Sequence, residues 1–229
     1  MRRINIEGIP SLIWGRKSDK VFIAVHGKMS SKENFTDFSS IAESKGYQVL
    51  SFDLPEHGER KTQAYACNPW NGVKDLGLIM NFARRNWTVL NLYAESLGAY
   101  FSLLAYQKEP LQNCLFLSPL LNMVKLIENM MNRAGVDTAK LQVHKEIPTS
   151  FGETLSWEYY SFARQNEIRH WQVPTAILYG SEDNLTDRKT VDTFTAQFNC
   201  NLSIMEGGEH WFHTPEQLNV MKKWLDRNI

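Results

Sequence analysis

Short, continuous apolar runs alternate along the chain with segments whose apolar residues recur at helical spacing. The runs are 21–25, 48–52, 88–93, 113–118 and 175–180. Continuous apolar runs of this length are typical of strands that are buried on both faces, as in a parallel sheet. We therefore expect an α/β fold with a mostly parallel, twisted sheet and helices on both of its faces.

The remaining periodic segments extend this pattern. Edge strands are predicted at 4–6 and 11–14, a last strand at 201–205, and helices at about 33–45, 73–85, 99–106 and 216–227. The helical segments are amphipathic, which is the pattern of helices that pack one face on a sheet. A chain of 229 residues is of a size for one α/β domain, so we expect residues 1–229 to form a single domain.

The alternation stops between Pro119 and Trp171, a segment rich in methionine and aromatic residues. An insertion after a strand of such a sheet lies at the end where ligands bind. We expect this segment, about 119–171, to form a small helical cap. Its methionines would suit an irregular apolar ligand, but they would equally fill gaps in a core.

Composition narrows the classes of partner. Lys and Arg number 25, as do Asp and Glu, and hydrophobic residues make up 43% of the chain. Without an excess of either charge, nucleic acids and other polyanions are not expected partners. The oligomeric state cannot be read from the sequence.

Targeting and redox signals point to a cytoplasmic protein. The first residues alternate apolar and polar side chains rather than forming the apolar core of a signal peptide, and no apolar run is long enough to span a membrane. Cys67, Cys114 and Cys200 are odd in number and widely spaced, as expected of free thiols in a reducing compartment. Their spacing does not suggest a metal site, and we expect no cofactor.

One predicted strand runs directly into a serine. The apolar run ends at Tyr93. It is followed by Ala94, Glu95 and then Ser96, which precedes a helical segment. A turn this tight holds the serine hydroxyl out at the end of the sheet and needs small residues two positions before and after it. Ala94 and Gly98 are small, although Ala94 departs from the usual G-x-S-x-G. Because a serine before a helix is also a common N-cap, the motif depends on its context.

A serine becomes a nucleophile when a base removes its proton and a third group holds that base in the right tautomer. The predicted strand that ends at Gly180 is followed by Asp183, and the last predicted strand, which ends at Met205, is followed by His210. Each candidate thus lies just past the end of a strand. The chain order Ser96, Asp183, His210 is the order expected in an α/β-hydrolase.

Other acids and histidines compete for these roles. Glu182 and Asp187 are alternative acids, and the spacing from Gly180 favours Asp183 over both. His213 is an alternative base, but its position suits the start of the final helix better. His26 and His57 are expected to hold loops near the site by hydrogen bonds, and His144 and His170 to lie at the surface. Glu95 could lie in a packed pocket behind the serine turn or contact solvent, and the sequence does not decide between them.

Taken together, these motifs resemble the α/β-hydrolase superfamily, and within it the small serine hydrolases with a His-Gly turn after the third strand. The resemblance extends over nearly the whole chain except the cap. It is carried by His26-Gly27, by Asp53-Leu54-Pro55-Glu56-His57-Gly58, by the serine turn, by Gly180-x-x-Asp183 and by His210 before an aromatic residue. The second motif is similar to the family's D-x-P-G-H-G, with Glu56 in place of a glycine.

The resemblance implies a serine carboxylester hydrolase that works through an acyl-enzyme without a cofactor. Its expected partner is a small-molecule ester or acyl substrate. Ser96 would be the nucleophile, His210 the base and Asp183 the orienting acid. The backbone N–H groups of Leu97 and Lys28 would hold the oxyanion, with His26, Gly27, Ala94 and Gly98 in supporting positions. A further hypothesis is that the Lys28 side chain attracts an anionic group on the substrate; a solvated surface lysine is the alternative.

Substrate choice stays open on sequence grounds. The apolar and aromatic cap suggests a short or medium acyl chain or an aromatic ester. A thioesterase or lysophospholipase-like activity is an alternative, because this fold supports several reactions. A non-catalytic binding protein with the same fold is a third possibility, since Ala94 and Glu56 stand where glycines are usual.

Overall fold

A computed structural model describes residues 1–229 and shows one large, twisted sheet. Its strand order is β1-β2-β4-β3-β5-β6-β9-β10. The strands are β1 (Arg2–Ile6), β2 (Ile9–Trp14), β3 (Lys20–Val25), β4 (Gln48–Phe52), β5 (Val89–Glu95), β6 (Cys114–Leu117), β9 (Thr175–Gly180) and β10 (Asn201–Met205). All neighbouring pairs from β4 to β10 are parallel, while β1 and β2 add an antiparallel edge. The predicted α/β fold with a mostly parallel sheet is confirmed.

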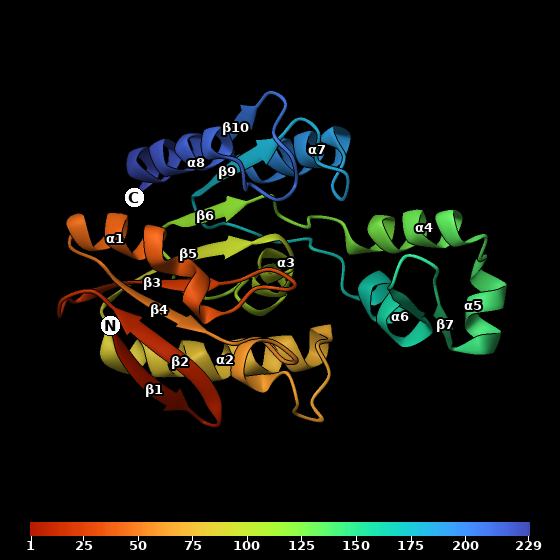
Figure 1. Ribbon diagram of the computed structural model, residues 1–229, viewed down its shortest axis with the longest axis horizontal. Coiled ribbons are helices and arrows are strands. Elements are labelled where there is room, and N and C mark those ends of the chain that lie inside the picture. The colour runs from red at the N-terminus through yellow and green to blue at the C-terminus, as the bar shows by residue number, and fades with distance from the viewer.

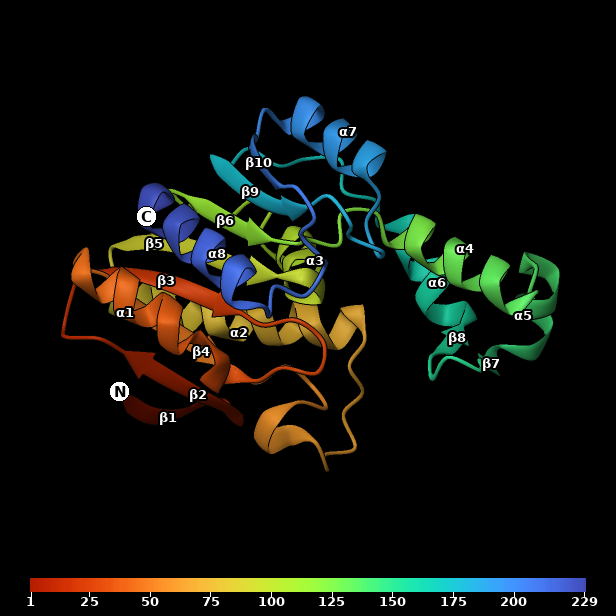
Figure 2. The ribbon, with the colours of Figure 1, turned by 45° about the horizontal axis from the view of Figure 1, so that its top comes forward.

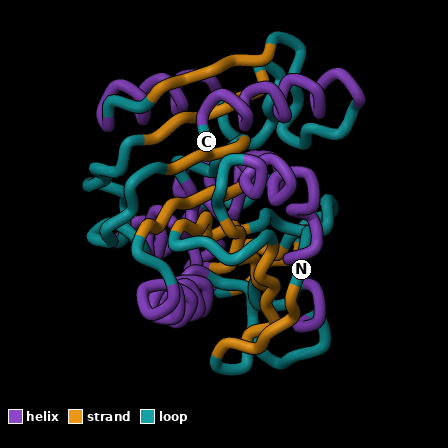
Figure 3. The backbone as a smooth tube through the Cα atoms, turned by 90° about the vertical axis from the view of Figure 1, so that its left-hand side faces the viewer, coloured by secondary structure: helices purple, strands orange, loops and turns teal.

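Helices cover both faces of this sheet (Figure 1 and Figure 3). One face carries α1 (Thr36–Ser44) and α8 (Pro215–Asn228), and the other carries α2 (Pro69–Asn86), α3 (Ser96–Ala105) and α7 (Arg188–Phe198). Strand β5 shows why two layers form. Its neighbours Leu92 and Tyr93 point to opposite faces, because side chains alternate along a strand, and each belongs to a different hydrophobic cluster.

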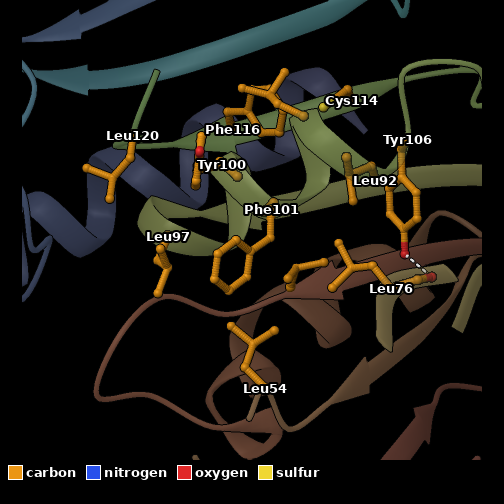
Figure 4. Packing of buried hydrophobic residues seen from close by; sticks show 14 of the residues in the cluster. Leu54, Leu76, Leu92, Leu97, Tyr100, Phe101, Tyr106, Cys114, Phe116 and Leu120 are labelled. Atoms are coloured by element: carbon orange, nitrogen blue, oxygen red, sulfur yellow. Dashed lines mark hydrogen bonds between the residues drawn. The ribbon is translucent and has the colours of Figure 1, made fainter. Parts of the chain in front are cut away.

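The face under α2 and α3 holds the larger cluster (Figure 4). Phe101, Tyr106 and Phe116 are fully buried in it. At the end of α3 the Tyr106 hydroxyl donates a hydrogen bond to the carbonyl of Leu76 in α2, at 2.9 Å. The phenol therefore brings its polar atom into the core without leaving it unpaired, and it ties the two helices together.

Several predicted boundaries need correction. Helix α2 begins at Pro69 rather than near residue 73, because the Asn68 side chain accepts from the N–H of Asn71 at 2.9 Å and caps the helix. The predicted helix at 33–45 is divided into a short 3-10 turn, Lys32–Phe35, and α1. Helix α7 was not predicted, because its apolar positions are few and lie among polar residues.

The segment that joins β6 to β9 leaves the sheet at the carboxyl ends of its strands and forms a separate layer (Figure 1 and Figure 2). It contains α4 (Met123–Ala134), α5 (Thr138–His144), β7 (Glu146–Pro148), β8 (Thr154–Ser156) and α6 (Trp157–Gln165). We call this segment the cap. The β7–β8 hairpin was not expected, and the assignment of residues 1–229 to a single domain stays a prediction. None of the helices combines the length and apolar character needed to cross a bilayer.

Candidate active site

The turn between β5 and α3 is as tight as the sequence pattern requires. Ser96 has a φ of 48°, in the left-handed region that L-residues rarely adopt. Gly98 has no room for a side chain, since a Cβ atom there would lie 2.5 Å from the carbonyl oxygens of Val25 and His26. The methyl group of Ala94 is fully buried within the sheet. Alanine at this position is therefore compatible with the turn, whereas position 98 must be glycine.

Three side chains form a continuous hydrogen-bonded chain at the end of the sheet. Ser96 Oγ lies 2.8 Å from His210 Nε2, and His210 Nδ1 lies 2.7 Å from Asp183 Oδ2. The other oxygen of this buried carboxylate accepts from the N–H groups of Leu185 and Thr186, at 2.8 and 2.9 Å. Asp183 can accept but not donate, so it fixes the imidazole tautomer with the proton on Nδ1 and leaves Nε2 free to accept from the serine.

The acid and histidine loops lie side by side because their backbones pack directly together. A Cβ atom at Gly180 would collide with the backbone of Gly208, so only glycine allows this contact. The N–H of Glu182 donates to the Gly208 carbonyl at 2.8 Å, and the N–H of Gly207 donates to the Ser181 hydroxyl at 2.8 Å. These contacts bring residues that are distant in sequence into one rigid pair of loops.

The alternative acids lie elsewhere. Asp187 caps α7 by accepting from the N–H of Thr190 at 3.0 Å, and it pairs with Lys125 Nζ at 2.6 Å. Burial raises the pKa of Asp187, but the hydrogen bonds from Lys125 and Thr190 outweigh it and lower the pKa overall. Glu182 is exposed. Neither carboxylate contacts a histidine, so of the three candidate acids only Asp183 reaches His210.

The other histidines do not reach Ser96. His213 is exposed, stacks on Trp211 with ring centroids 4.5 Å apart, and faces Glu209 at 3.4 Å. His144 and His170 are exposed, as expected. The side chains do not include a group of three or more His, Cys, Asp or Glu residues arranged to hold a metal ion.

Two backbone N–H groups lie beside the serine. Leu97 is in the first turn of α3, where N–H groups have no partner within the helix. Gly27 approaches so closely that a Cβ atom on it would lie 3.1 Å from Ser96 Cβ, and Lys28 follows directly. The N–H groups of Lys28 and Leu97 make no hydrogen bond within the protein. Both are free to donate to an oxygen anion bound next to Ser96.

His26 and His57 hold the segment around Lys28 from behind, as predicted. His26 donates from Nδ1 to the carbonyl of Gly27 at 2.7 Å and accepts at Nε2 from the N–H of Leu54 at 3.0 Å. Burial lowers the pKa of His26 from 6.5 to about 4, so the ring is neutral at physiological pH. His57 Nε2 accepts from the N–H of Met29 at 3.1 Å.

Beneath these histidines lies a buried ionic cluster that the sequence analysis did not single out. Lys32 Nζ lies 2.7 Å from both Asp53 Oδ2 and Glu59 Oε1, and Arg60 pairs with Asp75 at 2.6 Å. Burial alone would lower the pKa of Lys32, but its hydrogen bonds to the carboxylates raise it well above its usual value. Polar residues in loops give no sequence signal of burial, because only the fold brings these partners together.

The same loop explains one departure from the family motif. Gly58 has a φ of 53°, and a Cβ atom on it would overlap the Asp53 carboxylate, so glycine is required there. Glu56 has a φ of 61°, which is costly for a residue with a side chain. Its carboxylate accepts from the N–H of Cys67 at 2.7 Å. That hydrogen bond compensates for part of the strain where the family usually has a glycine.

Glu95 lies behind the serine turn and not in the hydrogen-bonded chain. Its Oε1 accepts from the Tyr93 hydroxyl at 2.7 Å. Burial raises the pKa of Glu95 to about 7, and the bond from Tyr93 opposes this shift. Glu95 is half-buried, so it lies between the packed and the solvent-exposed positions that the sequence left open.

A cavity of about 730 Å³ lies between Ser96 and the cap. Ser96, Leu97 and the loops that carry Lys28 and His57 contribute to one side of it, and α4, β8 and α6 contribute to the other. Its apolar lining includes Leu120, Met123, Leu126, Ile127, Met130 and Leu155. A cavity of this size and character suits a small or medium-sized apolar ligand.

The Lys28 side chain extends to the cap side of this cavity. Its ammonium group forms an ion pair with Glu153, and both side chains are partly exposed. The lysine is therefore neither a simple solvated residue nor a free cation. It connects the loop beside Ser96 to the cap.

Comparison with solved structures identifies the fold. The chain is similar to Est1E from Butyrivibrio proteoclasticus, with a TM-score of 0.79, 16% identity and coverage of 99% of this chain and 96% of that one. It is also similar to mouse alpha/beta hydrolase domain-containing protein 10, with a TM-score of 0.78, 13% identity and coverage of 99% and 96%. A monoacylglycerol lipase from Paleococcus ferrophilus matches with a TM-score of 0.69, 17% identity and coverage of 96% and 99%.

No protein-family model and no curated protein sequence matches the chain. The similarity to solved structures nevertheless spans both chains almost completely. The chain has the α/β-hydrolase fold.

Proposed function

We propose that this chain, with its α/β-hydrolase fold, is a serine hydrolase that cleaves a carboxylic ester through an acyl-enzyme intermediate. The observation that carries the proposal is the hydrogen-bonded chain from Ser96 through His210 to Asp183, with links of 2.8 and 2.7 Å. A nucleophile, a base and an orienting acid in this order are what covalent acyl transfer requires.

In the first step Ser96 Oγ attacks the ester carbonyl carbon, and His210 Nε2 takes the hydroxyl proton. The carbonyl electron pair moves onto oxygen and forms a tetrahedral oxyanion. The N–H groups of Leu97 and Lys28 donate to that oxygen. Each donor of this kind typically contributes about 3–4 kcal/mol of transition-state stabilisation, because it is oriented before the charge develops.

In the second step the tetrahedral intermediate collapses, the ester C–O bond breaks, and His210 hands its proton to the departing alcohol. Water then attacks the acyl-enzyme with His210 again as the base. The bond between Ser96 Oγ and the acyl carbon breaks, His210 returns the proton to Oγ, and the carboxylic acid leaves. Throughout, Asp183 stabilises the imidazolium that His210 becomes, and it keeps its own negative charge.

The substrate we propose is an ester with a short or medium acyl chain or an aromatic group. The cavity beside Ser96 supports this class because its cap side is lined by leucine, isoleucine and methionine side chains. Among the structural neighbours, Est1E has been solved with ferulic acid, an aromatic acid, bound. That ligand belongs to the neighbour, and it motivates the inclusion of aromatic esters in the assay.

The test is labelling of the purified protein with a fluorophosphonate probe, in parallel with Ser96→Ala and His210→Ala. We expect wild type to be labelled and both variants to lose labelling, followed by turnover of nitrophenyl esters by wild type alone. Thioesters and lysophospholipids in the same panel measure the alternative activities. Folded wild-type protein that neither labels nor turns over any ester would favour a non-catalytic binding protein instead.

A further inference from the structure

A second cavity, of about 390 Å³, lies where the cap meets α7. Residues of α4, α6 and α7 form its walls, together with Tyr100 of α3. Half of its lining residues are hydrophobic, including Met123, Ala163, Phe194 and Phe198, and the other half are polar or charged, including Lys125 and Glu167. The reaction steps proposed for Ser96, His210 and Asp183 do not involve this cavity.

The two cavities are consecutive along the helices that line them. On α3 the lining passes from Leu97 in the first cavity to Tyr100 in the second, and on α6 it passes from Tyr159 to Ala163. Residues three or four apart lie above one another on a helix, about 5 Å apart along its axis. On both helices, therefore, the second cavity begins one turn beyond the first (Figure 4 shows Leu97 and Tyr100).

Met123 is the one residue that lines both cavities. Its side chain is unbranched and flexible, so it can change rotamer with little cost. Tyr100 also lines the second cavity and is buried.

We infer that Met123 is a movable partition, and that the substrate carries an unbranched apolar chain that passes it and ends in the second cavity. The inference rests on the proposed esterase function and extends its substrate class from short and medium chains to long ones. The chain belongs to either the acid or the alcohol part of the ester. Its recognition would come from the burial of successive methylene groups along α3, α4 and α6.

The test compares kcat/KM for nitrophenyl palmitate with that for nitrophenyl butyrate. Each methylene that becomes buried contributes roughly a fourfold gain. If Met123→Ala lets about one or two further methylenes become buried, the palmitate-to-butyrate ratio should rise about tenfold. Ala163→Leu narrows the second cavity and should lower the ratio by about the same factor. The matched control is Met130→Ala, which makes the same change in α4 but lines the first cavity only. Equal shifts in the two methionine variants, or no drop in Ala163→Leu, would overturn the inference.

Methyl palmitate and hexadecyl acetate distinguish the two sources of the chain. If Met123→Ala changes kcat/KM for methyl palmitate, the chain belongs to the acid part of the ester. If it changes kcat/KM for hexadecyl acetate, the chain belongs to the alcohol part. If Met123→Ala changes kcat/KM for neither ester, the inference is contradicted.

A binding measurement separates failure of the inference from failure of the proposed function. Binding of palmitate or hexadecanol to Ser96→Ala, measured by calorimetry, should weaken about tenfold when Ala163→Leu is added. If no ester is hydrolysed but this weakening is observed, the hydrolase proposal fails and the path through Met123 stands. If short esters are hydrolysed and Ala163→Leu weakens the binding of neither palmitate nor hexadecanol, the path fails and the hydrolase stands.

Discussion

The two sides of the main cavity are built from different interactions. On the sheet side, the loops that carry Ser96, Lys28, Asp183 and His210 are fixed by glycine contacts, histidine hydrogen bonds and the buried Lys32 cluster. The cap side is lined largely by methionine, leucine and isoleucine.

This difference separates two requirements of a hydrolase. Acyl transfer depends on distances that must hold to within a few tenths of an ångström, and charged hydrogen bonds with one good geometry can enforce them. Recognition of an apolar group requires only complementary volume, which flexible side chains provide in many arrangements. Substitutions on the sheet side should therefore change rate and stability, whereas those on the cap side should change substrate preference.

The largest effect is expected when the orienting acid is changed. Asp183→Asn keeps the size of the side chain but presents His210 with an amide, which favours the wrong imidazole tautomer. We expect kcat to fall by about ten-thousandfold, as is typical for such a change. Steady-state turnover of a nitrophenyl ester measures it, with circular dichroism to establish that the variant is folded. A fall of less than about tenfold would remove Asp183 from the mechanism.

The next effect is on stability. Lys32→Met leaves the buried carboxylate of Asp53 without its cation, and breaking a buried pair in this way costs about 3–5 kcal/mol of unfolding free energy. The matched control is Lys222→Met, which breaks an exposed pair with Asp37 and should cost less than about 1 kcal/mol. Urea titration of both variants makes the comparison. Similar losses in the two would contradict the distinction between buried and exposed pairs.

A third effect concerns pH. Because His26 has a pKa of about 4 in the folded protein and an ordinary value of 6.5, the unfolded chain takes up a proton first as pH falls. The stability that neutral His26 contributes is complete above pH 6.5 and is lost as pH falls toward 4, by about 3 kcal/mol in total. Urea titrations across this range should show a smaller loss for His26→Gln.

Glu95 changes the pH dependence of stability in the opposite direction, so its effect must be separated from that of His26. Its pKa is raised to about 7 in the folded protein, so its contribution is present below pH 4.5 and is lost as pH rises through 7. Both wild type and His26→Gln contain Glu95, so the difference between their pH profiles reports His26 alone. Parallel profiles for the two proteins would show that His26 does not titrate as described.

The smallest effect is expected at the exposed pair that joins the two sides. Glu153→Gln removes the partner of Lys28 and should change stability by less than about 1 kcal/mol. It should also leave Lys28 free to attract anions, so an ester that carries a carboxylate should gain severalfold in kcat/KM over its neutral analogue. The double variant Lys28→Ala, Glu153→Gln should lose that gain, and an unchanged preference in Glu153→Gln would reject the role of Lys28 in binding anions.

The sequence predicts a structural feature well where a short stretch of residues is enough to determine it. The turn at Ser96 needs small residues at fixed positions, and buried parallel strands are continuous apolar runs, so the fold and the convergence of Asp183 and His210 at the serine were predictable. Their catalytic roles stay predictions until the variants are assayed.

The same reasoning fails where the determinant is long-range. Lys32 and Asp53 read as loop residues, since only their proximity in the fold makes them a buried pair. Helix α7 is hidden because Val191 and Phe194 are nearly its only buried residues, and packing rather than local pattern stabilises it. The pairing of Glu153 with Lys28 depends on the β7–β8 hairpin, whose turn contains Gly152, but only the fold brings that hairpin to the loop of Lys28.

The strand order has a consequence for how the protein is made. Strand β5, which leads into Ser96, lies in the middle of the sheet, with earlier strands on one side and later strands on the other. Because Ser96 precedes β10 and His210 in the chain, the ribosome synthesises the serine well before β10 and the loop that carries His210. Under the proposed mechanism, a nascent chain that has folded only its first half holds an inert hydroxyl, and labelling by a fluorophosphonate should report that synthesis and folding are complete.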